Sequence, residues 1–129
     1  MEVKLVIDGR LDGLNEYTKV GRTPRRGATL QSKMKRENQE IVGWYIKAQI
    51  SNIHFESPVK LQFHWYEENR RRDIDNICFS KKFILDALVE NGIIPNDNQQ
   101  YVHGFTDEFF VDKENPRIEV FIKEDVNEE

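Results

Sequence analysis

Three aspartates and a lysine in the second half of the chain have the types and spacing needed for metal-assisted phosphodiester chemistry. Asp73 and Asp75 lie two residues apart, so in extended backbone their carboxylates project to the same side. Two carboxylates held close repel each other unless a proton or a cation lies between them. Magnesium, a hard cation, prefers a few carboxylate oxygens together with water and a substrate phosphate. The arginines at 70–72 suit phosphate oxygens, which indicates a phosphodiester substrate.

A third acid and a basic group follow at positions that allow them to join this pair. Asp97 lies in the polar turn GIIPNDNQQ and would complete a site for one or two cations acting on an in-line displacement at phosphorus. Lys82 is a candidate for stabilising transition-state charge, and the pattern alone does not separate it from Lys81. Each residue has a simpler alternative: Asp75 as a helix cap, Asp97 as a turn former and Lys82 as a solvated helix lysine. The DxD spacing by itself favours capping, and Asp97 shifts the balance towards a metal site.

Alternating and helical hydrophobic patterns predict the elements that would position these residues. The predicted strands cover 3–8, 59–66, 101–105 and 117–123, with 107–111 as a further pairing segment, and the predicted helices cover 29–50 and 76–90. Residues 9–27 are punctuated by glycine and proline and are predicted to be irregular. Asn91-Gly92 supplies a stop for the second helix. We expect one domain over residues 1–129, of the α+β or α/β class, with a small mixed β-sheet packed against two main helices.

The distribution of charge along the chain matters more than its net value of -4. Residues 17–36 contain seven basic side chains and no acidic one, whereas residues 107–129 carry nine acidic and three basic side chains. The first 106 residues therefore have a net charge of +2. A separate basic segment indicates a nucleic-acid footprint, and a solvated loop with a solubilising tail is the alternative. For the acidic tail at 124–129 we expect either disorder or screening of the DNA-binding surface when DNA is absent.

Whole-chain features exclude several classes of protein. The lone Cys78 excludes an intramolecular disulfide and a cysteine-rich zinc site, and it is consistent with a reducing cytoplasm. The opening residues MEVKLVIDG lack the pattern of a signal peptide. No run approaches the roughly 20 apolar residues of a membrane-spanning helix. We expect a soluble cytoplasmic protein with no membrane partner and no small-molecule cofactor.

The run RRDIDN followed by KKFILDALVENGIIPNDNQ resembles the RusA family of Holliday junction resolvases. The resemblance implies that Asp73, Asp75 and Asp97 are the metal-binding catalytic aspartates. It places Lys82, four residues before the aspartate of LDAL, at the family's functional lysine. Aligned from Asp75 instead, where this chain is three residues longer than the shorter members, Phe79 would occupy that position.

The same resemblance, with the basic segment, implies a set of residues that contact DNA. The early motif GLNEY is similar to a loop that many members carry before a basic helix, where an asparagine lies near the active site, and the DxD motif has matching flanks. The predicted DNA-binding residues are Asn15, Arg22, Arg25, Arg26, Lys33, Lys35, Arg71, Arg72 and Asn76. Further candidates for stacking on bases are Tyr17, Trp44 and Tyr66. For Trp44, a place in the hydrophobic core is favoured over base stacking.

The function implied is a magnesium-dependent endonuclease, with manganese as an alternative ion. It would act as a homodimer on four-way DNA junctions, cutting by paired symmetric nicks in recombination and repair. A two-fold substrate with two symmetric cuts matches two sites on a two-fold symmetric protein. Small proteins of this kind are often encoded by prophages. The alternatives are a flap- or fork-nicking nuclease on the same scaffold, and a structure-selective DNA-binding protein without catalysis.

Overall fold

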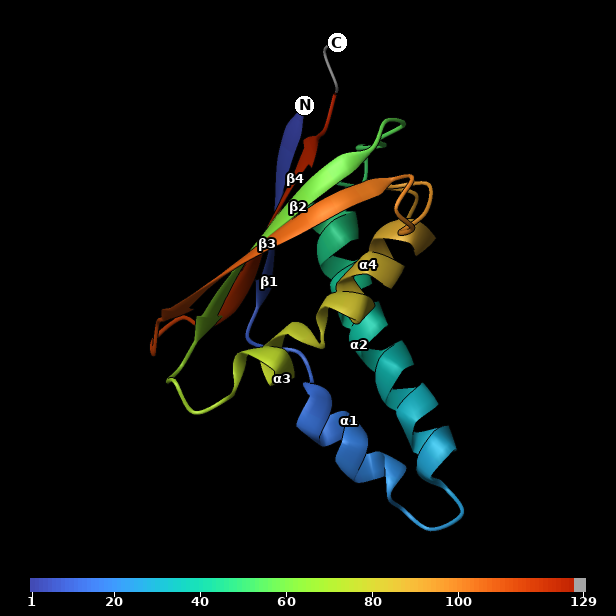
Figure 1. Ribbon diagram of the computed structural model, residues 1–129, viewed down its shortest axis with the longest axis vertical. Helices are drawn as coiled ribbons and strands as arrows, with labels where there is room; N and C mark the ends of the chain where they lie inside the picture. The colour runs from blue at the N-terminus through green and yellow to red at the C-terminus, as the bar shows by residue number, and fades with distance from the viewer. Residues whose placement is uncertain (127–129) are drawn as a thin grey trace.

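A four-stranded sheet with helices against one face forms the body of the molecule (Figure 1). The computed structural model describes residues 1–126. The elements, in chain order, are β1 (Glu2–Asp8), α1 (Leu14–Gly21), α2 (Gly27–Gln49), β2 (Val59–Glu67), α3 (Ile74–Cys78), α4 (Lys81–Glu90), β3 (Val102–Val111) and β4 (Arg117–Glu124). This single-domain α+β arrangement, with a mixed sheet and two longer helices, confirms the expected fold class.

The strands lie in the order β1-β4-β2-β3, which makes β3 an edge strand. β1 and β2 both pair antiparallel with β4, whereas β2 and β3 are parallel. A parallel neighbour requires a crossover, and here α3 and α4 supply it. The chain therefore leaves β2, passes through the DxD motif and α4, and returns along β3, which places the candidate site beside the sheet edge.

The core lies between the sheet and the two longer helices. Alternate residues of β2 (Val59, Leu61, Phe63 and Trp65) are buried, as the sequence pattern predicted. They meet the apolar faces of α2 and α4, whose buried side chains include Val42, Ile46, Phe83, Ile84 and Leu88. Figure 1 shows α2 and α4 on the same side of the sheet, with the α1–α2 hairpin extending beyond it. The hairpin thus projects away from the sheet, and α1 contains no buried residue.

Three predicted elements differ from the structure. Residues 9–27 are not wholly irregular, because α1 forms over residues 14–21. The predicted helix at 76–90 is split into α3 and α4, since the Ser80 hydroxyl donates to the Ile77 carbonyl (3.0 Å) and the turn there is closed by bonds three residues apart. The predicted strand at 101–105 and its pairing segment at 107–111 form one continuous strand, β3.

Two further expectations change at the surface. Trp44 is 71% exposed on α2, so the core position favoured for it was wrong. The acidic tail begins inside the sheet, because Glu124 is the last residue of β4, and the Asp125 carboxylate accepts from His103 Nδ1 at 2.8 Å. Residues 127–129 of that tail lie outside the described residues. Within residues 1–126, no helix is long and apolar enough to cross a membrane.

Candidate functional site

The first pair of predicted metal ligands lies where the chain leaves β2 and enters α3. Asp73 is the N-cap residue of α3 in extended backbone (φ −68°, ψ 151°), yet its side chain makes no capping hydrogen bond. One Asp75 carboxylate oxygen accepts from the backbone N–H of Asn76 at 3.0 Å. Both side chains are exposed, and neither forms an ion pair within residues 1–126. Each carboxylate therefore keeps at least one oxygen free for a cation, although one Asp75 oxygen also serves a first-turn N–H of α3.

Arg72 is fixed within the loop that carries these aspartates. Its Nε and Nη2 donate to the two carboxylate oxygens of Glu67 at 2.7 and 2.8 Å, and its side chain is only 13% exposed. Its Nη1 is buried without a hydrogen-bond partner among the described residues. The bidentate pair fastens the loop to the end of β2. Arg72 is therefore paired with Glu67 in this structure, and its contact with DNA stays a prediction.

Asn76 joins the start of α3 to the start of α1. Its side chain is buried, and its Oδ1 accepts from the backbone N–H of Asn15 at 2.8 Å. Gly13 permits this approach, because a Cβ at that position would lie 2.5 Å from the same Oδ1 and 2.6 Å from the Asn76 carbonyl oxygen. Asn76 therefore joins the two helices through this hydrogen bond, and its contact with DNA stays a prediction. Asn15 does lie beside the DxD motif, and its own side chain is exposed.

Lys82 links the third predicted aspartate to α4. Its Nζ lies 3.2 Å from Asp97 Oδ2 and 3.0 Å from Asp86 Oδ1, while Lys35 on α2 approaches Asp86 Oδ2 at 3.4 Å. The hydrogen bond to Asp86, followed by the one to Asp97, raises the pKa of Lys82 above its usual value. The ammonium is therefore protonated at neutral pH. Lys82 is a fixed cation beside Asp97 rather than a base.

The neighbouring lysine has different surroundings. Lys81 is 14% exposed and its Nζ lies 2.7 Å from Asp107 Oδ2 on β3, with the Phe105 ring at 4.5 Å. Asp107 also accepts from the indole N–H of Trp65 at 2.9 Å. Lys81 thus fastens the start of α4 to the edge of the sheet. Of the two lysines left open by the sequence, Lys82 is the one that contacts a predicted metal ligand.

This difference predicts unequal effects of removing the two ammonium groups. We expect Lys82→Met to lower the rate of the phosphodiester cleavage predicted from the sequence by about tenfold to a hundredfold, because a preorganised positive charge is lost. Because the pKa of Lys82 is raised, its ammonium stays charged and its ion pairs stay intact at every pH below the ordinary pKa of a lysine. These ion pairs are lost only as the pH rises through the raised pKa. The ratio of the Lys82→Met rate to the wild-type rate should therefore be the same from about pH 6 to pH 9. Single-turnover rates of Lys82→Met, Lys82→Arg and Lys81→Met would test this, and a Lys82→Met rate equal to that of the wild type would contradict it.

Cys78 is the last residue of α3 and is chemically inert at neutral pH. Partial burial, and then the negative charge of Asp107, raise the pKa of its thiol to about 11. A protonated thiol is a poor nucleophile and a poor metal ligand. Cys78 therefore belongs to the packing around the site and not to its chemistry.

One chain supplies two carboxylates that suit a magnesium ion. Asp73 and Asp75 fit a hard cation, since both offer exposed carboxylate oxygens without a competing ion pair among the described residues. However, within residues 1–126 no three Asp, Glu, His or Cys side chains gather closely enough to hold a metal ion. Asp97 is instead held by Lys82. One chain therefore supplies a pair of suitable ligands and leaves the third apart from them.

The predicted basic segment occupies the α1–α2 hairpin. All seven of its basic residues are exposed: Lys19, Arg22, Arg25, Arg26, Lys33, Lys35 and Arg36. Within the described chain only two form ion pairs, one with Glu37 at 3.8 Å and one with Asp86 at 3.4 Å. Arg25 adopts a positive φ of 64° at the tip of the hairpin. The hairpin thus presents a largely uncompensated positive surface.

Several residues that organise the site were not singled out in the sequence. Asp86 is bound by lysines from two helices, and only its spacing of four residues from Lys82 could have indicated this. Glu67 lies just past the predicted strand at 59–66, and Asp107 begins the predicted pairing segment at 107–111; their partners lie five and 26 residues away. Gly13 was marked in the sequence only as one of the glycines within 9–27 and as the first residue of GLNEY. Such partners become visible only when the crossover between β2 and β3 is formed.

Comparison with known proteins identifies a relationship over most of the chain. The family model described as Endodeoxyribonuclease RusA matches residues 15–123. The match includes the basic hairpin, the DxD motif, Lys82 and Asp97. No curated protein matches the chain.

Proposed function

The chain belongs to the RusA endodeoxyribonuclease family, and from that premise we propose that it is a magnesium-dependent nuclease that resolves four-way DNA junctions as a homodimer. The proposal assigns it to recombination and repair of DNA in the cytoplasm. Asp73, Asp75 and Asp97 would hold the ion, and manganese is an alternative to magnesium.

The observation that carries the proposal is the pair of exposed, uncompensated carboxylates at the start of α3. An arginine-rich loop precedes them, and in it Arg70 and Arg71 remain exposed. Negative charge held beside a phosphate-binding surface weakens binding, so a protein that only bound DNA would be better without it. A cation held by Asp73 and Asp75 would remove this conflict. The geometry therefore favours a nuclease over the binding-only alternative.

The mechanism divides among residues of the described chain. The basic hairpin holds the DNA backbone through Arg22, Arg25, Arg26 and Lys33, giving affinity for phosphate without sequence readout. Arg71, exposed before the DxD motif, orients the scissile phosphate. When bound, the cation neutralises charge that develops on the phosphate oxygens. Lys82 keeps a positive charge beside Asp97 and stabilises the leaving oxygen.

A homodimer offers a way to complete the ligand set. Because Asp97 does not join Asp73 and Asp75 within one chain, we propose that Asp97 of the partner subunit completes each site. In a two-fold dimer this arrangement yields two equivalent sites, which matches two symmetric nicks. It also makes cleavage dependent on assembly, so that a lone subunit cannot nick DNA.

Mixed dimers would test the shared site. Asp75→Asn and Asp97→Asn subunits are each expected to be inactive alone. In a mixed dimer, a shared site leaves one of the two sites with all three aspartates, and nicking activity returns. If each site were built within one chain, both sites of the mixed dimer would carry a defect and activity would stay absent. The measurement is nicking after mixing differently tagged subunits and isolating the mixed species.

The proposed function itself is tested by nicking of a synthetic four-way junction beside a matched linear duplex, with magnesium, with manganese and with chelator. Paired, metal-dependent nicks on the junction alone are expected. Flap and fork substrates distinguish a junction resolvase from the alternative nuclease on the same scaffold, which would nick flaps or forks in preference to four-way junctions. Binding without cleavage under either metal would leave the non-catalytic alternative.

Binding through the hairpin predicts a strong dependence on salt. We expect Arg25→Ala and Arg26→Ala together to reduce the slope of log affinity against log salt by about 2, because two phosphate contacts and their released counterions are lost. Affinity should fall similarly for all DNA sequences. Lys47→Ala, an exposed lysine near the other end of α2, is the matched control. Equal slopes for the double variant and the wild type would rule the hairpin out as a DNA contact.

A further inference from the structure

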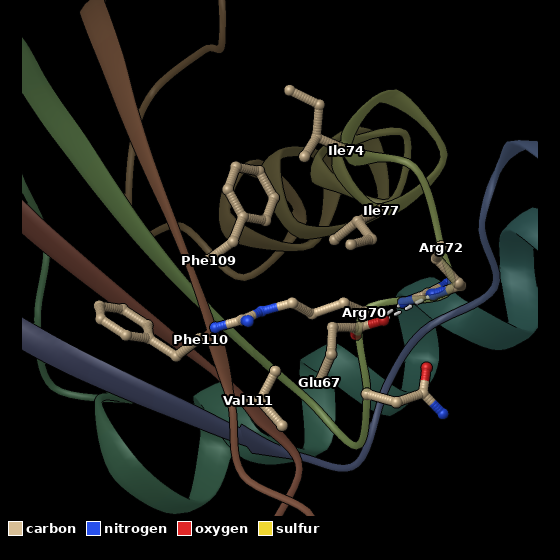
Figure 2. A pocket seen from close by; sticks show the side chains of 9 residues that line it. Glu67, Arg70, Arg72, Ile74, Ile77, Phe109, Phe110 and Val111 are labelled. Atoms are coloured by element: carbon tan, nitrogen blue, oxygen red, sulfur yellow. Dashed lines mark hydrogen bonds and ion pairs between the residues drawn. The ribbon is translucent and has the colours of Figure 1, made fainter.

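A groove between α3 and the end of β3 adjoins the candidate metal ligands. Figure 2 shows Ile74 and Ile77 of α3 facing Phe109 of β3, with Arg70 crossing beside them. The groove has a volume of about 520 Å³, which includes the part that is open to solvent. Its apolar walls are unusually accessible, since Ile74 is 62% exposed and Phe109 is 37% exposed. Large apolar side chains left open beside a polar site indicate a binding surface.

The position of the groove relates it directly to the scissile phosphate. Ile74 lies between Asp73 and Asp75 in the chain, so the groove wall and the predicted metal ligands share one turn of backbone. A phosphate bound at those aspartates carries its own nucleoside within reach of the groove. The groove therefore neighbours the proposed reaction site through the backbone of Ile74, and neither Asp73 nor Asp75 lines it.

The charge lining the groove suits a nucleotide. Glu67 contributes the carboxylate in the lining, and Arg72 neutralises it through two hydrogen bonds. Arg70 has no ion-pair partner among residues 1–126 and remains available as a cation. A guanidinium beside an aromatic ring and aliphatic walls matches the face and the edge of a nucleobase.

We propose that this groove binds one unstacked base of branched DNA, next to the phosphate that is cut, an inference that rests on the proposed nuclease function. In a linear duplex every base is stacked and paired, and removing one costs free energy. At a branch point stacking is already interrupted, so a base is available at lower cost. Phe109 provides the stacking ring and Ile74 the opposing wall. The groove thereby contributes to selection of branched over linear DNA.

The test uses the full-length protein and four-way junctions in which 2-aminopurine replaces single bases around the branch point. In chelator, wild-type protein is expected to change the fluorescence of one of these bases, and Phe109→Ala is expected to abolish that change. With magnesium, Phe109→Ala should lower the nicking rate by about tenfold, as expected for one lost base-stacking contact. Phe109→Tyr should restore both signals, because it keeps the ring.

Phe105→Ala is the matched control, since Phe105 lies on the same strand, is 44% exposed and stands outside the groove. A junction with an abasic site at the responsive position gives the second comparison. Removing that base should mimic Phe109→Ala, and the two changes together should cost no more than either alone. Thermal unfolding of each variant shows whether a loss reflects folding instead.

The outcomes separate the two proposals. The base-binding role of the groove is overturned, and the nuclease function is not, by either of two results. The first is an equal decrease in nicking rate for Phe109→Ala and Phe105→Ala. The second is a decrease in nicking rate by Phe109→Ala that is as large on the abasic junction as on the intact one. Conversion of the dimer to a monomer by Phe109→Ala, seen in sedimentation, assigns the groove to a subunit interface and also overturns it. A fluorescence change that depends on Phe109, without nicking under any metal, overturns the nuclease function and leaves the groove as a base-binding site.

Discussion

Replacing Asp75 by asparagine is expected to lower the rate of junction nicking by about a thousandfold or more, while binding to the junction is retained. The asparagine side chain has the same shape, and its carbonyl oxygen can still accept from the N–H of Asn76, as Asp75 does now at 3.0 Å. The start of α3 should therefore be preserved. What is lost is the negative charge that would hold the cation, and with it the neutralisation of charge on the phosphate.

Binding and cleavage must be measured separately to interpret this variant. Junction affinity in chelator should be equal to or tighter than that of the wild type, because one negative charge beside the DNA has been removed. Asp8→Asn, at the exposed end of β1, is the control for loss of an acidic charge elsewhere. Wild-type nicking by Asp75→Asn would remove the DxD motif from the proposed chemistry.

The largest effect expected outside the acidic residues comes from Gly13→Ala. The added Cβ would lie 2.5 Å from Asn76 Oδ1 and 2.6 Å from the Asn76 carbonyl oxygen, and also 3.1 Å from Arg72 Nη1. The carbonyl belongs to the backbone of α3 and cannot rotate away. We expect a loss of about 1–3 kcal/mol in the free energy of unfolding, as for other overpacked positions. Nicking should fall beyond the loss of folded protein, because the strain displaces the helix that begins beside Asp75.

Gly104→Ala provides the matched control, since nothing lies within 4 Å of a Cβ built at Gly104 on β3. Its free energy of unfolding should be within about 0.5 kcal/mol of the wild-type value. Urea denaturation measures both variants, and an unchanged slope with denaturant shows that the comparison is between the same states. Equal stability of the two variants would show that the contact between Gly13 and α3 relaxes at little cost.

The family, the fold class and most strands could be predicted from the sequence, because their causes are local. Alternation of apolar residues in 59–66 requires one buried face, and β2 has that face. The spacing of the DxD motif predicted two carboxylates converging from extended backbone. The structure has Asp73 extended at the N-cap of α3 and Asp75 in the first turn of that helix, with both side chains exposed, and their convergence on a cation stays a prediction. The charge contrast between residues 17–36 and the remainder of the chain likewise needed no structure, since composition alone defines it. The roles of these residues in cleavage and in DNA binding stay predictions.

Other features depended on tertiary structure because their causes are distant in sequence. Trp44 is a large aromatic residue for which a core position was favoured, but it is exposed on α2. Lys81 and Lys82 are equivalent by composition, and only the packing of α4 directs one to Asp107 and the other to Asp97.

Arg72 and Asn76 have the residue types of a DNA-binding motif, and folding pairs them with groups brought from β2 and α1. Residue type and spacing thus determined which side chains are available for chemistry in this protein. The crossover from β2 to β3 decided which of them face solvent, because burial and pairing depend on contacts between segments tens of residues apart.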